Sequence, residues 1–387
     1  MTATVIVIPK TTLIFTSAAI NGAAGAAVGT WTSDAGAANT YVTSAGIRST
    51  TATDYVTIPF TGNHLYLCGA GGNLGGRFTV KIDGVDQGGY FEQFMPNGSG
   101  ANAVRYRDII PIARNLSSGA HTAILTAVGD GYLTIDQFYA ISGAKASPTL
   151  NTYAALGDSW TYGVGSSQAT GGSYPNGFAN QVAKMLSTKL AVGAPFIYTR
   201  KGVPGDAWYC RASVPGVGGA GAASGDSTVV GGLYRFLNDI VPLNPQYITA
   251  MFGTNDIIGD YSGAMQIVRH VQSFLSLCED VFDVTGVNGA PVRVALGTGQ
   301  YATSLALTPL PPSTNGDMRD AFETSAMMIR MVGRKYLWLR LADVAGSLDG
   351  RDYAMYPNNQ GAADYGVHPN NIGHALVAGE FFHALTS

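Results

Sequence analysis

A serine and a histidine occur in settings that suit nucleophilic catalysis. Ser159 follows Leu156-Gly157-Asp158, where a short apolar run, residues 152–156, ends in a turn that the glycine permits. A serine at the end of a strand in an α/β sheet is well placed to act as a nucleophile. Because a free hydroxyl is a weak nucleophile, it needs a base within hydrogen-bond reach. The candidate base is His368, far downstream in Val367-His368-Pro369-Asn370.

Two further motifs supply candidate hydrogen-bond donors. Residues 201–206 (KGVPGD) and 252–256 (FGTND) each follow a predicted strand. Acyl transfer through a serine requires a nucleophile, a base and donors that bind the developing oxyanion. The candidate donors are the backbone N–H groups of Ser159 and Gly205 and the side-chain amide of Asn255. Glycine suits a backbone donor because no Cβ blocks the substrate, and asparagine donates while uncharged.

In this order the motifs resemble the SGNH, or GDSL-type, hydrolase family, named for its Ser, Gly, Asn and His residues. The matching segments are GDSW at 157–160, GVPGD at 202–206, GTND at 253–256 and HPN at 368–370. The resemblance covers about residues 151–387. It implies a flavodoxin-like three-layer α/β fold and esterase, lipase or carbohydrate deacetylase activity that uses no metal and no other cofactor.

The acid that would orient His368 departs from the pattern of this family. The family places its acid three residues before the histidine, where this chain has Tyr365, and the nearest carboxylate, Asp364, lies one residue earlier. We favour Asp364, because Gly366 gives the turn the freedom to bring that carboxylate within reach. The alternatives are Asp352 and a backbone carbonyl, and the second would leave a Ser–His dyad.

Several other residues near the motifs have either a structural or a functional interpretation. Four aromatic rings belong either to the core or to a substrate rim on which a sugar stacks: Trp160, Tyr162, Trp208 and Tyr209. Three acidic residues are expected to hold loops through hydrogen bonds: Asp158, Asp206 and Asp256. His374, inside the last predicted helix, is expected to be structural, and Asn255 has helix capping as its alternative role.

After residue 151 the pattern predicts strands that alternate with helices. The strands are predicted at 152–156, 196–199, 247–252, 292–296 and 337–341, and the helices at 178–186, 267–278, 317–335 and 372–385. This alternation predicts a parallel sheet covered on both faces, with ligands at the carboxyl ends of the strands. The Gly/Ala-rich residues 212–228 are expected to form a surface loop near that edge.

The first part of the chain, residues 1–141, is predicted to be an all-β sandwich or jelly roll. Residues 78–82 alternate apolar and polar side chains, and Asp83-Gly84 and Asp130-Gly131 predict hairpin turns. Residues 1–50 are an arm, an oligomerisation segment or an edge strand. The small, polar residues 142–151 predict a linker, so that residues 152–387 form the catalytic domain and residues 1–141 an accessory or carbohydrate-binding module.

Composition and the start of the sequence indicate which partners and settings suit the protein. A net charge of −3, with charged residues at only 12%, gives no electrostatic case for binding nucleic acid or an anionic membrane. Three widely spaced cysteines favour buried free thiols over a disulfide framework. No basic residue precedes the short apolar run at residues 5–8, so no signal peptide is predicted. A virion component and a secreted enzyme with a trimmed leader are the favoured settings.

These observations favour a serine esterase that removes a small acyl group, acetyl foremost, from a carbohydrate. The front domain resembles the jelly-roll modules that precede SGNH domains in some carbohydrate esterases and phage tail proteins. The alternatives are a lipase, a general short-chain esterase, or a non-catalytic phage tail protein that binds a glycan or receptor. A homo-oligomer or a place in a virion tail is compatible with each of these interpretations.

Overall fold

The computed structural model describes residues 4–9, 14–16, 26–34, 46–95, 104–143, 145, 147–167, 174–190, 195–211, 230–259, 264–299, 312–349, 351, 354 and 368–387. The chain forms two compact units. Unit 1 comprises Met1–Ala146 and two short later segments, Tyr209–Ser213 and Ser273–Val281. Unit 2 comprises Ser147–Trp208, Val214–Gln272 and Phe282–Ser387.

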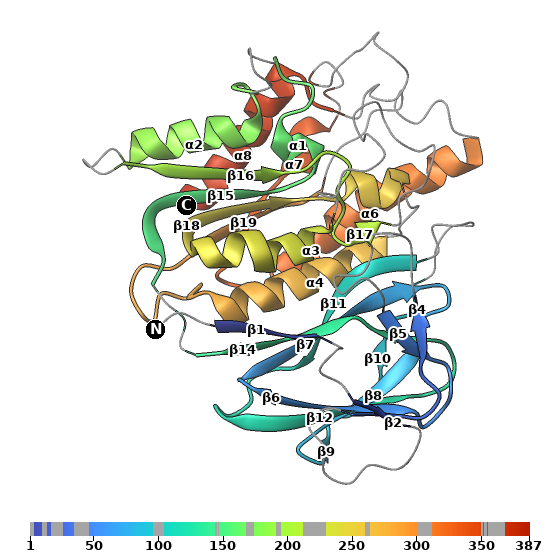
Figure 1. Ribbon diagram of the computed structural model, residues 1–387. Coiled ribbons are helices and arrows are strands. Elements are labelled where there is room, and N and C mark those ends of the chain that lie inside the picture. The colour runs from blue at the N-terminus through green and yellow to red at the C-terminus, as the bar shows by residue number, and fades with distance from the viewer. Residues whose placement is uncertain are drawn as a thin grey trace. The chain divides into compact units, whose positions relative to one another are not determined.

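Unit 1 is built from largely antiparallel sheets (Figure 1). Its strands are β1 (Thr4–Pro9), β2 (Ile14–Thr16), β3 (Ala26–Val28), β4 (Thr32–Asp34), β5 (Gly46–Ser49), β6 (Tyr55–Thr61), β7 (His64–Gly72), β8 (Arg77–Ile82), β9 (Val85–Asp86), β10 (Phe91–Glu92), β11 (Val104–Ala113), β12 (Ala120–Ala127), β13 (Leu133–Ile135), β14 (Gln137–Ser142) and β17 (Cys210–Arg211). One sheet has the order β1-β14-β7-β11-β17, a second runs β10-β8-β12-β6-β3-β2, and a third β13-β5-β4. Because β1 lies at the end of its sheet, residues 4–9 form an edge strand, one of the three alternatives for the start of the chain.

The core of unit 1 lies between the two larger sheets. In β8 the side chains of Phe78, Val80 and Ile82 are buried, while the residues between them are less so. Buried apolar side chains from β6, β8 and β12 share one cluster with those from β7, β11 and β14. Two sheets that bury their facing sides against each other form a sandwich. The all-β prediction is therefore confirmed, whereas the narrower jelly-roll topology stays a prediction.

The two predicted Asp-Gly hairpins have different outcomes. Asp83 and Gly84 have φ angles of 52° and 81°, the positive values that a two-residue hairpin turn needs, and they join β8 to β9. The second hairpin, at Asp130-Gly131, is wrong, because β12 and β13 lie in different sheets. The Asp130 carboxylate instead accepts hydrogen bonds from the backbone N–H of Arg77, at 2.9 Å, and from its Nε, at 2.5 Å.

Unit 2 contains a five-stranded parallel sheet, with β15 (Thr149–Gly157), β16 (Ile197–Gly202), β18 (Pro245–Met251), β19 (Arg293–Gly297) and β20 (Arg340–Ala342). The helical elements are α1 (Ser159–Tyr162), α2 (Phe178–Lys189), α3 (Gly232–Arg235), η2 (Phe236–Ile240), η3 (Val241–Leu243), η4 (Asn255–Gly259), α4 (Ala264–Val281), α6 (Pro312–Gly333), α7 (Val344–Leu348) and α8 (Asn371–Thr386). The order β16-β15-β18-β19-β20 is the flavodoxin-like order 2-1-3-4-5. The predicted α/β fold is confirmed.

Both faces of this sheet are covered, because consecutive residues of β15 point to opposite faces and all are buried from Tyr153 to Gly157. Tyr153 and Ala155 pack in one cluster with Phe178 of α2 and Phe381 of α8. Figure 1 shows α2 and α8 on one side of the sheet and α3 on the other. Among the described residues, no helix is long and apolar enough to cross a membrane.

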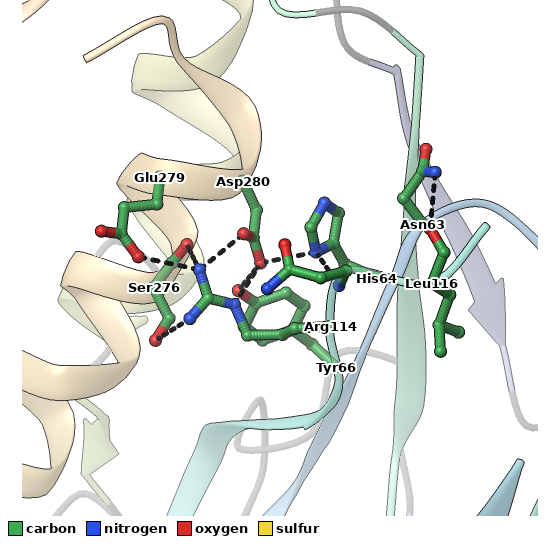
Figure 2. Close-up of polar contacts among 9 residues, drawn as sticks. Asn63, His64, Tyr66, Arg114, Leu116, Ser276, Glu279 and Asp280 are labelled. Atoms are coloured by element: carbon green, nitrogen blue, oxygen red, sulfur yellow. Dashed lines mark hydrogen bonds and ion pairs between the residues drawn. The ribbon is translucent and has the colours of Figure 1, made fainter. Parts of the chain in front are cut away.

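The last residues of α4, Ser273–Val281, belong to unit 1, where a buried polar cluster links them to strands of that unit (Figure 2). The Asp280 carboxylate accepts hydrogen bonds from Arg114 Nη2 at 2.6 Å, from Arg114 Nε at 2.8 Å and from the Tyr66 hydroxyl at 2.5 Å. His64 Nδ1 lies 3.1 Å from the same carboxylate. The cluster therefore pairs an almost fully buried carboxylate with a guanidinium fork, the geometry in which a buried charge is best compensated.

The cysteine prediction is also confirmed. Cys68, Cys210 and Cys278 are buried free thiols. Burial raises the pKa of the Cys68 and Cys278 thiols well above the ordinary value, so both remain protonated at neutral pH.

Candidate active site

Ser159 lies where β15 gives way to α1. The N-cap residue of α1 is Asp158, whose carboxylate accepts a hydrogen bond from the Trp160 backbone N–H at 3.0 Å, as expected for a residue that holds a loop. A Cβ on Gly157 would lie 2.0 Å from Thr161 Oγ1, so only glycine fits between β15 and the returning turn of α1. The sequence Gly-Asp-Ser therefore presents Ser159 at the carboxyl edge of the sheet.

His368 lies close to Ser159 in the fold, although the two residues are far apart in the sequence. Its Nε2 lies 2.8 Å from Ser159 Oγ, and both side chains are buried. His368 stands just before α8, whose N-cap Asn370 accepts hydrogen bonds from the backbone N–H groups of Ile372 and Gly373. A capped helix start holds the preceding residues in place, so the pair has the contact that the predicted nucleophile and base require.

The environment of His368 keeps its imidazole neutral. Burial lowers the pKa of His368 from its ordinary value to about 4. At neutral pH the ring therefore carries one proton, and Nε2 accepts the Ser159 proton when Nδ1 holds it. This is the protonation state that a general base requires.

His374, one turn into α8, is structural, as the sequence predicts. Its Nε2 lies 2.9 Å from the Val164 carbonyl oxygen, and its Nδ1 accepts from the Phe178 backbone N–H at 3.2 Å. These two contacts require a neutral ring with the proton on Nε2. Burial lowers the pKa of His374 to about 4, which favours that state. The ring ties the loop after Ser159 to the start of α2.

The predicted oxyanion donors emerge at one edge of the sheet. Gly157 of β15 is paired with Gly202 of β16 and with Met251 of β18, so the three following loops begin at the same level. Those loops carry Ser159, Gly205 and Asn255. The N–H of Ser159 stands at the first position of α1, where a helix provides no internal acceptor.

Gly205 and Asn255 have local geometries that suit donation. Gly205 has a φ of +82°, and a Cβ built on it would meet no atom within 4 Å. Asn255 begins η4, and its Nδ2 donates to the Asp206 carbonyl oxygen at 2.8 Å. Because a side-chain amide has two N–H bonds, this contact orients the group and leaves a second hydrogen for another acceptor. The three oxyanion roles remain predictions that this arrangement supports.

The predicted aromatic rim needs correction. Trp160, Trp208 and Tyr209 are 0%, 1% and 1% exposed, so their rings are core side chains, whereas a stacked sugar needs an open ring face. Trp160 points from α1 into the cluster under the sheet, and Trp208 packs on Phe252 with ring centroids 4.6 Å apart. Tyr162 alone of the four is partly exposed.

Tyr162 lies between a cation and a second ring. The Arg200 guanidinium stands 4.6 Å from the Tyr162 ring centroid, and Tyr174 meets it edge-on at 5.3 Å. These contacts hold the ring in place beside the loop that carries Ser159. A substrate-rim role for Tyr162 stays a prediction.

The predicted acid, Asp364, and its alternative, Asp352, lie outside the described residues, as does the predicted surface loop at 212–228. The two other acidic residues hold loops, as expected. Asp206 accepts from the Gly231 backbone N–H at 3.0 Å, and Asp256 from that of Trp208 at 3.3 Å.

Arg235, a buried charged residue that contacts Asp206 of the second motif, was not among the predicted residues. It is 4% exposed, and its guanidinium lies 2.5 Å from the Asp206 carboxylate. The only signal in the sequence is an arginine inside the otherwise apolar stretch Gly231–Leu237, where an unpaired charge would be costly.

The chain is similar to one protein family and to several solved structures. The model of the GDSL-like Lipase/Acylhydrolase family matches residues 155–376. Among solved structures, a family two carbohydrate esterase from Clostridium thermocellum in complex with cellohexaose is 14% identical, covering 87% of this chain and 93% of its own, with a TM-score of 0.37. A lipase/acylhydrolase from Enterococcus faecalis is 16% identical, covering 60% and 93%, with a TM-score of 0.37. No curated protein matches the chain.

Proposed function

Because the chain belongs to the GDSL-like lipase/acylhydrolase family, we propose that it is a serine esterase that removes a small acyl group, acetyl foremost, from a carbohydrate. The observation that carries this proposal is the 2.8 Å contact between Ser159 Oγ and His368 Nε2. The contact joins a nucleophile to a neutral base at the edge of the sheet where ligands bind in α/β folds.

Acylation begins when Ser159 Oγ attacks the carbonyl carbon of the ester and passes its proton to His368 Nε2. The carbonyl oxygen becomes an oxyanion, which accepts hydrogen bonds from the N–H groups of Ser159 and Gly205 and from Asn255 Nδ2. As the tetrahedral intermediate collapses, the bond to the sugar oxygen breaks. That oxygen takes the proton from His368 and leaves as the free hydroxyl, so that the acyl group stays on Ser159.

Deacylation repeats the sequence with water as the nucleophile. His368 Nε2 takes a proton from the water, and the resulting oxygen attacks the acyl carbon. The second intermediate uses the same donors, and its collapse returns the proton to Ser159 Oγ and releases the carboxylic acid. In this scheme a carboxylate at His368 Nδ1 fixes the tautomer, and Asp364 is the proposed carboxylate.

Two features of unit 2 support a small acyl group and a polar leaving group. The positions that a Cβ would occupy on Gly205 and Gly253, in the loops after β16 and β18, face open space. The exposed large apolar residues that the structure describes in unit 2 lie on different elements or loops, except Met327 and Met331, which are both on α6: Leu150, Ile197, Leu243, Met265, Val287, Met327, Met331, Leu337 and Ile372. A lipase that binds long acyl chains needs a continuous apolar surface.

A substrate series tests the proposal. Acetylated xylo- and cello-oligosaccharides are compared with nitrophenyl acetate, butyrate and octanoate, with kcat/KM as the readout. We expect efficient release of acetate from the oligosaccharides and a fall in kcat/KM from acetate to octanoate. A rise toward octanoate would instead support the lipase alternative.

The same substrate series, combined with fluorophosphonate labelling, distinguishes an esterase from a protein that only binds a glycan. No turnover of any ester, together with no labelling by a fluorophosphonate, would contradict an esterase and support a glycan- or receptor-binding protein such as a phage tail component.

A further inference from the structure

One buried guanidinium contacts several of the segments that carry the proposed catalytic groups. Arg235, at the end of α3, donates from Nη2 to the Gly157 carbonyl oxygen at 2.8 Å and from Nη1 to the Lys201 carbonyl oxygen. Gly157 is the last residue of β15, two positions before Ser159, and Lys201 is near the end of β16. One planar group therefore joins the carboxyl ends of two neighbouring strands.

The same guanidinium holds the loop that contains Gly205. Arg235 Nε donates to Asp206 Oδ2 at 2.6 Å, and the other carboxylate oxygen accepts from the Gly231 N–H at 3.0 Å. Burial raises the pKa of the fully buried Asp206 carboxyl, and the adjacent guanidinium opposes that rise. The carboxylate thus has a cation and a backbone donor as compensation, as a buried charge requires.

Asp206 also connects this pair to Asn255. Its carbonyl oxygen accepts the hydrogen bond from Asn255 Nδ2, at 2.8 Å. A chain of contacts consequently runs from Arg235 through Asp206 to the Asn255 amide. A second chain runs from Arg235 through Gly157 to the backbone of Ser159.

From these contacts we propose that Arg235 is a positioning residue of the esterase, which holds the Ser159, Gly205 and Asn255 donors at the separation that an oxyanion needs. This inference rests on the proposed function. The guanidinium is suited to the task because its five N–H donors lie in a rigid plane, whereas a lysine has one mobile point charge. Arg235 touches no substrate and transfers no proton, so its effect is on the geometry of the donors.

The first test is Arg235→Lys in the full chain, assayed on nitrophenyl acetate well below the melting temperature of the variant. Lysine keeps the charge beside Asp206 but cannot reach both strand ends. We expect kcat to fall about tenfold to a hundredfold, the scale of a displacement of about 1 Å at a catalytic group. KM should change little, because the donors act on the transition state.

A matched control separates positioning from loss of stability. Arg114→Lys removes the fork from another buried carboxylate, Asp280, which lies in unit 1. We expect both lysine variants to melt below the wild type, and only Arg235→Lys to lose kcat. Asp206→Asn serves as a second probe if Arg235→Lys fails to fold, because it weakens the same ion pair with little change of shape, and the same loss of kcat is expected.

A double-mutant cycle with Asn255→Ala identifies the route of the effect. Asn255→Ala alone should lower kcat by about 10²–10³. If Arg235 acts by placing this amide, the double variant should lose less than the product of the two single losses. A folded Arg235→Lys variant with the kcat of the wild type would overturn the inference, and multiplicative losses would overturn the part of it that concerns Asn255. Its failure is distinguishable from failure of the proposed function, which would appear as an inactive wild type.

Discussion

In the proposed mechanism, the burial of His368 determines the pH range in which Ser159 can react. A base must be neutral to accept a proton, so activity is present above the pKa of His368 and is lost as the pH falls below it. Burial alone places that pKa at about 4. A carboxylate at Nδ1 would raise it again, because a negative neighbour stabilises the imidazolium.

The acid limb of the pH profile therefore reports on the neighbours of His368. We expect kcat/KM of the wild type to rise with pH through a midpoint between about 4 and the unperturbed value of about 6.5. In Asp364→Asn the midpoint should move down toward about 4. A wild-type midpoint clearly above 6.5 would show that burial does not control this ring.

The size of the kinetic loss tests the identity of the acid separately. If Asp364 orients His368, Asp364→Asn should cost about 10⁴ in kcat, the scale found when a triad acid is neutralised in a serine protease. Asp352→Asn is the matched control and should remain active. Crippling of Asp352→Asn alone would move the acid to that residue, and a loss of less than about tenfold in both variants would favour a backbone carbonyl.

Individual residues differ in how far the sequence alone could identify them. The motifs of Ser159 and His368 were sufficient to predict a pair that the fold then brings into contact. Proximity to a motif did not predict exposure, because Trp160 and Trp208 lie beside predicted catalytic residues and yet point into the core. Arg235 could not be identified, because two of its partners are carbonyl groups of strands whose pairing the sequence does not show.

Among the secondary-structure elements, α8 contributes to the site twice. It begins just after His368, and its own His374 ties the Ser159 loop to α2. The alternation of strand and helix patterns predicted this helix and all five strands of the parallel sheet within a few residues. The hairpin predicted at Asp130-Gly131 was wrong, because a local turn signal does not reveal that Asp130 has the distant Arg77 as its partner.

The buried, neutral ring of His374 also predicts how the stability of the fold depends on pH. The pKa of His374 is about 4 in the folded chain, below the unfolded value of about 6.5, so the unfolded state takes up protons first. The contribution of His374 to the free energy of unfolding is therefore fully present above pH 6.5. It is lost as the pH falls toward 4, and the loss amounts to at most about 3 kcal/mol.

We expect His374→Gln to flatten that loss in urea titrations at pH 7 and pH 4.5, since an amide keeps one donor and one acceptor without titrating. His383→Gln, at an exposed position of the same helix, is the matched control for replacing a histidine there. An equal pH dependence in all three proteins would contradict a buried, neutral His374.

For the molecule as a whole, the sequence predicted a division near residues 142–151, and the long first segment of unit 1 ends at Ala146. Two later segments also belong to unit 1, which no local pattern reveals. The division into residues 1–141 and 152–387 stays a proposal. Ser159, Gly205, Asn255 and His368 all belong to unit 2.

The Arg114–Asp280 pair is expected to be a main source of stability in unit 1. Arg114→Met would leave an almost fully buried carboxylate without its cation, which typically costs about 3–5 kcal/mol. Urea denaturation of the full chain measures this loss. The control is Arg77→Met, whose pair with Asp130 is exposed to solvent, so that its loss should destabilise the chain much less. Equal losses in both variants would contradict the role of burial.

The central claim is that Ser159 is the nucleophile, and covalent labelling tests it most directly. The wild type, Ser159→Ala and Ser166→Ala are treated with a fluorophosphonate, and the adduct is located by peptide mass spectrometry. Ser166 is the matched control, a second buried serine in the same loop, whose hydroxyl donates to the Gly163 carbonyl oxygen. We predict one adduct, on Ser159, in the wild type and in Ser166→Ala, and none in Ser159→Ala. An adduct that persists in Ser159→Ala, or a wild type that hydrolyses esters without labelling at Ser159, would contradict the account.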